Sequence, residues 1–102
     1  MPVYLLATLK AKYGQIDRFS EVMKTLVPVM EAEGWKLVGA YQAIIGDLTQ
    51  VVDLWELPDA NAVGAGLAAA AASAGFDDIA AALAEVVEEE VLQVMVTTSY
   101  SP

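Results

Sequence analysis

The chain contains no cysteine and no histidine. Without cysteine it can form no disulfide and has no thiolate nucleophile. The absence of histidine removes the most common general base near neutral pH and, with it, the usual zinc and iron sites. No Gly-rich phosphate loop or nucleophile elbow occurs either. We therefore expect no metal site and no cofactor.

Cations are also scarce. Only five residues are Lys or Arg, against fourteen Asp and Glu, and the net charge is −9. All five cations lie within the first 36 residues, and ten acids follow them. An acidic surface has few cations with which to displace the counterions of nucleic acid or of an anionic membrane, so it gains no binding energy from their release. Neither is therefore expected as a partner. A net charge of this size is typical of small apolar proteins, which it helps to keep soluble.

Long hydrophobic runs are missing as well. No stretch of about 18 large apolar residues occurs that could span a bilayer. The Ala-rich tract at residues 65–74 is interrupted by Gly66 and Ser73. No basic segment followed by an apolar one stands at the N-terminus,. We therefore expect a cytoplasmic protein that does not enter a membrane.

What the chain does have is a large apolar share for its length. Hydrophobic residues make up 57% of it, and its mean hydropathy is +0.50. Its 102 residues suffice for one domain, residues 1–102, and a domain of this size buries only about two thirds of its unfolded surface. One small core cannot hide both faces of four apolar strand-like runs. We therefore expect a homodimer in which a second copy covers one face.

The hydrophobic pattern changes its period along the chain and predicts an order of strands and helices. Ile16, Phe19, Met23 and Met30 recur at helical spacing,. Further along, a short turn containing Gly46 and Asp47 separates two β-rich runs, as in a hairpin,. The expected strands cover residues 3–11, 35–45, 50–57 and about 90–99, and the expected helices cover residues 15–33, 60–74 and about 77–87,.

This order is β-α-β-β-α-β with the last helical part split in two, which is the ferredoxin-like motif of the α+β class. The fold has a four-stranded antiparallel sheet with helices on one face only. The helix-free face is therefore the surface through which we expect the two copies to pair.

Residues 36–39 (KLVG) and 45–55 (IGDLTQVVDLW) resemble the NIPSNAP family. The opening Tyr4-x-Leu6-x-Thr8 is similar too, and the resemblance extends over about residues 3–57. It implies a dimeric α/β barrel, in which two ferredoxin-like sheets pack face to face around a shared interior. Related barrels include cofactor-free monooxygenases of antibiotic biosynthesis.

The chain departs from the family pattern at positions that bear on chemistry. A histidine is common just before the Leu-Trp pair, where this chain has Asp53, and an arginine common in the first strand corresponds to Ala7. Arginines usual after the third strand are absent from the Ala-rich tract. The resemblance therefore implies the fold and the dimer more directly than an activity.

Strand alternation sorts side chains onto two faces. A carboxylate against the helices would be costly, which favours placing Asp53 in the barrel interior. On the second strand Gln42 favours an interior position, although Tyr41 permits the opposite face, and the first strand fits either way. The residues expected to line the interior are Gln42, Val51, Asp53, Trp55, Gln93, Met95 and Thr97.

A mostly apolar lining with a few polar groups is typical of small-molecule pockets. The first hypothesis is a homodimeric accessory protein that binds a small apolar or aromatic ligand. The second is a cofactor-independent monooxygenase or isomerase of secondary metabolism, in which Asp53 moves a proton on a ligand stacked against Trp55. The third is a purely structural or interaction dimer, whose close-packed interior would leave no cavity.

Overall fold

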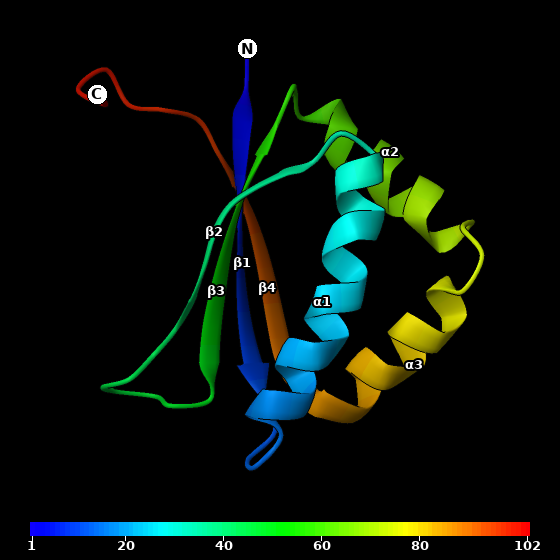
Figure 1. The fold of residues 1–102 in the computed structure, drawn as a ribbon. Helices are drawn as coiled ribbons and strands as arrows, with labels where there is room; N and C mark the ends of the chain where they lie inside the picture. The colour runs from blue at the N-terminus through cyan, green and yellow to red at the C-terminus, as the bar shows by residue number, and fades with distance from the viewer.

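Four antiparallel strands form one sheet in the order β2-β3-β1-β4 (Figure 1). The computed structural model describes residues 1–102. Its elements are β1 (Val3–Ala11), α1 (Ile16–Ala32), β2 (Lys36–Gln42), β3 (Gln50–Leu57), α2 (Asn61–Ala71), α3 (Phe76–Val86) and β4 (Val87–Met95). The strand order and connections are those of the ferredoxin-like fold, which confirms the predicted fold class.

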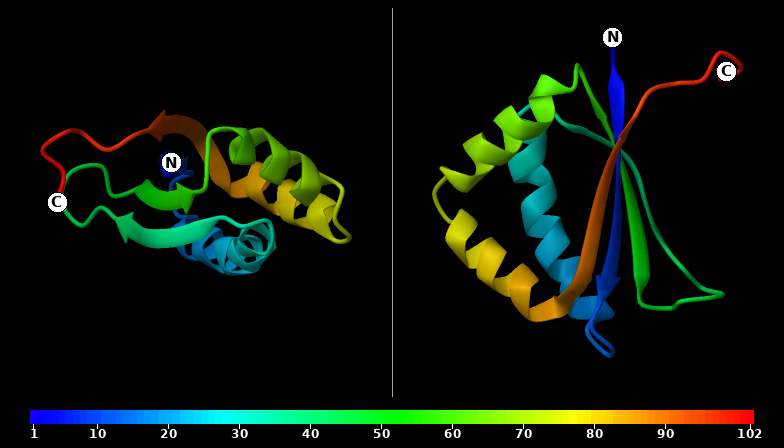
Figure 2. Two further views of the ribbon diagram at one scale, coloured as in Figure 1. Left: turned by 90° about the horizontal axis from the view of Figure 1, so that it is seen from above. Right: turned by 180° about the vertical axis from the view of Figure 1, so that it is seen from behind.

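All three helices cover the same face of the sheet (Figures 1 and 2). The molecule measures 40 × 37 × 17 Å, and its radius of gyration is 14.0 Å, above the roughly 13 Å of a compact chain of this length. It is therefore a thin slab of two layers, with one sheet face left bare. No single helix is both long and apolar enough to cross a bilayer; α2 and α3 reach that length and hydropathy only together, and they are bent by 106° at their junction.

Alternation along β1 and β3 decides which side chains reach the core. The odd-numbered residues of both strands are buried beneath the helices, whereas the even-numbered ones between them are only half-buried. Leu5 and Leu57 are both 1% exposed and belong to the same core cluster as Phe19 of α1, which is 2% exposed. Because side chains alternate between faces, the even-numbered set forms the helix-free surface.

The helix-free surface has an apolar centre. Leu6 of β1 and Leu54 of β3 are cross-strand partners there. On the edge strand β4, Val91 is 61% exposed, and it pairs with Thr8 on the same face. Two segments, residues 43–49 and the chain after Met95, project to this side of the sheet (Figures 1 and 2). Both segments carry exposed apolar side chains, namely Ile44, Ile45, Leu48, Val96 and Tyr100.

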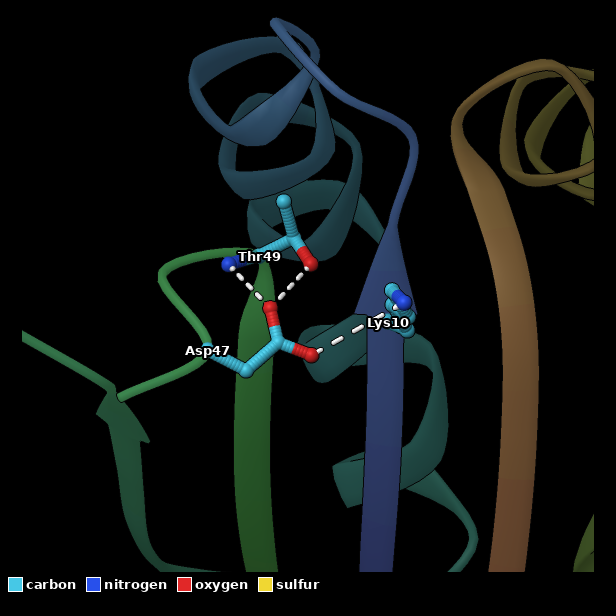
Figure 3. Close-up of polar contacts among 3 residues, drawn as sticks. All are labelled: Lys10, Asp47 and Thr49. Carbon is cyan, nitrogen blue, oxygen red and sulfur yellow. Dashed lines mark hydrogen bonds and ion pairs between the residues drawn. The ribbon is translucent and has the colours of Figure 1, made fainter. Parts of the chain in front are cut away.

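The loop between β2 and β3 is longer than predicted, because β2 ends at Gln42 instead of Ile45. The side chain of Asp47 organises this loop. One of its oxygens accepts hydrogen bonds from the Thr49 hydroxyl (2.6 Å) and backbone N–H (3.0 Å), and the other lies 3.8 Å from Lys10 Nζ (Figure 3). Gly46 adopts a φ of 97°, which glycine allows without strain,.

The last strand begins earlier than predicted. β4 starts at Val87, directly after α3, and ends at Met95, whereas the sequence pattern favoured residues 90–99. The backbone N–H of Lys12 donates to the Val86 carbonyl at 2.8 Å and so fixes the chain at the start of the strand. Glu89 and Glu90 consequently belong to a strand and face opposite sides of the sheet, since they pair with Lys10 and Leu9.

Candidate functional site

Asp53 and Trp55 lie beneath the helices, not on the helix-free face. Each is 3% exposed, and both follow the buried parity of β3. The predicted placement of Val51, Asp53 and Trp55 in a chamber shared by two copies is therefore wrong for the third strand. The prediction assumed that a carboxyl under the helices would meet close-packed hydrocarbon. In the structure it meets a cavity instead.

The cavity lies between the sheet and the three helices and has a volume of about 170 Å³. Twelve of its fourteen lining residues are hydrophobic. The first strand supplies Leu5, Ala7 and Leu9, α1 supplies Met23, Leu26 and Met30, and α2 and α3 supply Leu67, Phe76 and Leu83. The two polar lining residues are Asp53 and Glu90. The lining thus combines an apolar wall with two carboxyl groups.

Ala7 sits at the centre of the sheet beneath this cavity. It pairs with Asp53 on one side and with Leu92 on the other. Its neighbours on the same face of β1, Leu5 and Leu9, carry large side chains, so the small methyl of Ala7 leaves space above the strand. Both positions at which β1 and β3 depart from the family pattern, Ala7 and Asp53, are therefore direct neighbours.

Two indoles line one side of the cavity. The Trp35 and Trp55 rings pack edge to face, with centroids 5.5 Å apart and planes at 73°, an arrangement favoured by the aromatic quadrupole. Trp35 Nε1–H donates to the Ala62 carbonyl at 3.1 Å, which ties the residue before β2 to α2.

The Asp53 carboxyl has no protein partner. It forms no hydrogen bond or ion pair, and neither of its oxygens is sealed in the protein interior. Burial, and secondarily the negative charge of Glu90, raises the pKa of Asp53 to about 6. At this pKa the carboxyl gains and loses its proton near neutral pH, as a general acid or base must.

A groove adjoins the cavity on the β2 side. Its volume is about 400 Å³, and it lies between α1 and the β2–β3 part of the sheet. Asp53 and Met23 line both spaces and so stand at their boundary. Lys24 also lines the groove, but its Nζ donates to the Glu21 carboxylate at 2.9 Å. The groove offers a path from solvent to the Asp53 side of the cavity.

The other predicted ligand-binding residues do not all gather around Asp53. Val51 lines the groove, and Gln42 is its exposed cross-strand partner near the end of β2. Gln93 and Met95 pair with Leu6 and Tyr4, which places both on the helix-free face as predicted,. Thr97 lies beyond the end of β4 and is exposed. The seven predicted residues are thus divided between the two faces.

Several lining residues were not singled out from the sequence. Glu90 and Trp35 entered the sequence analysis only as the first residues of the last and second predicted strands. Strand alternation places Glu90 on the same face as Leu92, and this signal was already present in the predicted strand at residues 90–99. Nothing in the sequence shows that a cavity remains between the sheet and α2 or α3.

The NIPSNAP family model matches residues 4–102, nearly the whole chain. The chain belongs to the NIPSNAP family. This confirms the resemblance seen in residues 36–39 and 45–55 and extends it through the Ala-rich helices to the C-terminal strand. No curated protein matches the chain by sequence.

Solved structures share the fold at low sequence identity. A NIPSNAP family protein from Agrobacterium tumefaciens superposes with a TM-score of 0.90 at 14% identity, covering 100% of this chain and 98% of that one. A NIPSNAP-like domain protein from Burkholderia xenovorans gives 0.85 at 16% identity, covering 99% and 89%. SnoaB from Streptomyces nogalater, a cofactor-independent oxygenase, gives 0.74 at 16% identity, covering 99% and 97%. The NIPSNAP chain thus has the fold of the dimeric α/β-barrel proteins.

Proposed function

We propose that this NIPSNAP chain binds a small, mainly apolar molecule in the cavity between its sheet and its helices. The observation that carries the proposal is the Asp53 carboxyl, 3% exposed and without a protein partner, in a cavity whose other walls are almost entirely hydrophobic. An apolar pocket with a few placed polar groups is the usual form of a ligand site. A purely structural domain gains nothing from a buried acid that no protein group stabilises.

The cavity volume sets the size of the ligand. Drug-sized ligands occupy pockets of roughly 300 Å³ or more, and this cavity measures about 170 Å³. An apolar cavity of about 150 Å³ is sufficient for a benzene-sized molecule. The expected ligand is therefore a single ring with a short substituent.

The active form in this proposal is a homodimer that pairs through the helix-free face. Support comes from the apolar surface around Leu6 and Leu54 and from the two projecting apolar segments beside it. A slab only 17 Å thick leaves that face uncovered. Because the cavity lies on the other face, each subunit of the dimer holds its own ligand.

The test is titration with a neutral single-ring probe, 2-phenylethanol, followed by fluorescence of Trp35 and Trp55 and by calorimetry. We expect saturable binding of one probe per chain. Ala7→Leu fills the space above β1 and should abolish binding, whereas Ala69→Leu, on the exposed surface of α2, should leave it intact. Mass spectrometry of the purified protein provides the matching search for a bound natural ligand. Absence of a copurifying ligand together with no saturable binding of the probe or of its amine and carboxylate analogues would overturn the proposal.

A second candidate is a cofactor-independent enzyme in which Asp53 transfers a proton. It is favoured by the pKa of Asp53, which lies at about 6, and by the fold shared with the oxygenase SnoaB. Trp55 lines the same cavity and would hold an aromatic substrate. Once a substrate is in hand, Asp53→Asn should reduce kcat by about 100-fold or more. Unchanged turnover by this variant would exclude the role.

A further inference from the structure

We propose that the ligand is a cation, specifically a small aromatic amine whose ammonium group lies between Asp53 and Glu90. The inference rests on the proposed function and adds the chemical class of the ligand. It depends on the charges that line the cavity, on their placement around Ala7, and on the aromatic side chains that surround them. Each of these is a separate observation.

The cavity has negative groups and no positive one. Asp53 from β3 and Glu90 from β4 are its only charged lining residues. The elements that pack over them present only apolar side chains to the cavity, among them Met23 from α1, Leu67 from α2 and Phe76 from α3. Two acids facing one apolar space repel each other, and a bound cation removes that repulsion.

The cations nearest to the cavity form ion pairs outside it. Lys24 of α1 lines the neighbouring groove and donates to Glu21. Arg18 of α1 forms an ion pair with Glu85 of α3 on the exposed surface. Neither cation neutralises Asp53. A positive partner for its carboxylate would therefore have to come from outside the chain.

The sheet register places the two acids on either side of β1. Asp53 is the cross-strand partner of Ala7, and Glu90 is the partner of Leu9 on the opposite neighbour. Both side chains point to the helix side, and the small methyl of Ala7 lies between their strands. Asp53 is 3% exposed, whereas Glu90 is exposed at the edge strand. A cation entering from the Glu90 side thus meets one accessible carboxylate and then one buried carboxylate.

The remaining walls suit an aromatic body attached to such a cation. Trp35, Trp55 and Phe76 supply aromatic surface, and Met23 and Met30 supply polarisable thioethers that contact rings favourably,. Aromatic faces also attract ammonium groups within about 6 Å. With a volume of about 170 Å³, the cavity accommodates one ring and a short alkylammonium chain, as in an arylethylamine.

The experiment compares three probes of nearly equal shape: 2-phenylethylamine, 2-phenylethanol and 3-phenylpropionate. At pH 7.5 we expect the amine to bind at least about tenfold more tightly than the alcohol, because a charge-assisted hydrogen bond replaces a neutral one. The carboxylate should show no binding. Asp53→Asn should bring the amine to the affinity of the alcohol, while Glu56→Gln, on the other face of the same strand, should change neither.

The outcomes separate this inference from the function on which it rests. If the alcohol binds as tightly as the amine, or if the carboxylate binds best, the cation proposal is overturned and small-molecule binding stands. If Asp53→Asn leaves the preference for the amine intact, the assignment of Asp53 is overturned. If none of the three probes binds and no ligand copurifies, both proposals fail. A folded Asp53→Asn variant, checked by circular dichroism, is required for each comparison.

Discussion

The indole N–H of Trp35 donates to the carbonyl of Ala62 at 3.1 Å and so connects the first residues after α1 with the first turn of α2. The same indole packs edge to face against Trp55 of β3. One side chain thus contacts the sheet and holds a helix that arches above it. This contact maintains one wall of the cavity, and its close approach to α2 depends on the residue one turn further along that helix, Gly66.

Gly66→Ala tests this arrangement. A Cβ at this position would collide with Trp35 Nε1, so the indole must move. We expect a loss of about 1–3 kcal/mol in the free energy of unfolding and a red shift of tryptophan fluorescence. Gly64→Ala is the matched control on the same helix, because nothing lies within 4 Å of its added methyl. The control should be neutral or stabilising by up to about 1 kcal/mol. Equal effects of the two variants would contradict the packing described for Trp35.

The order of elements was predictable because each follows from local chemistry. The 3.6-residue period from Ile16 to Met30 and the alternation in β3 are strong signals, and β3 has the predicted bounds,. Element ends were less predictable, since they depend on contacts distant in sequence. The start of β4 is fixed by the bond from Lys12 to the Val86 carbonyl, which no pattern in residues 87–99 reveals.

The candidate site was only half predictable. Asp53 and Trp55 were identified as the residues of interest, and the structure brings both to one cavity. The sheet face predicted for them was wrong. The prediction assumed a close-packed interior beneath the helices, where a buried carboxylate would be costly. A cavity arises from how far α2 and α3 stand above Ala7, and this distance depends on tertiary packing instead of on the sequence of any one strand.

The pKa of Asp53 makes stability depend on pH. Its value is about 6 in the folded chain, against an ordinary value of 3.8. Between these values the folded state binds more protons than the unfolded state, so stability falls as the pH rises through about 6 and levels off roughly one pH unit above that value. The difference between the two pKa values corresponds to at most about 3 kcal/mol in the free energy of unfolding. Solvent in the cavity reduces this to about 1–2 kcal/mol. Urea unfolding at pH 4.5 and pH 7.5 measures this loss.

Asp53→Asn removes the titrating group and should flatten this dependence. At pH 7.5 the variant should be about 1–2 kcal/mol more stable than the unmodified chain, because no charge is buried in the cavity. Glu90→Gln keeps the acid and removes its charged neighbour, so it should lower the pKa of Asp53 and give an intermediate dependence,. Equal slopes against pH for the unmodified chain and Asp53→Asn would show that Asp53 does not titrate in this range.

The helix-free face gives the last prediction. Leu6 and Leu54 are cross-strand partners at its centre, and a second copy packed there would remove both from water. Leu54→Lys places a charge in this apolar surface and should raise the dimer dissociation constant by more than about 100-fold. Sedimentation at micromolar concentration should then change from a dimer to a monomer. Because the cavity lies on the other face, the affinity of each chain for 2-phenylethanol should change little.

Ala69→Lys adds the same charge to the exposed surface of α2 and leaves the helix-free face untouched. It should remain dimeric. The comparison separates the effect of where the charge lies from the effect of adding a charge to the chain. Circular dichroism of Leu54→Lys must show a folded chain, as expected for a half-buried strand position. A stable monomer of the unmodified chain, or a dimer undisturbed by Leu54→Lys, would contradict pairing through this face. Either result would require another explanation for apolar residues gathered on the uncovered side of a slab only 17 Å thick.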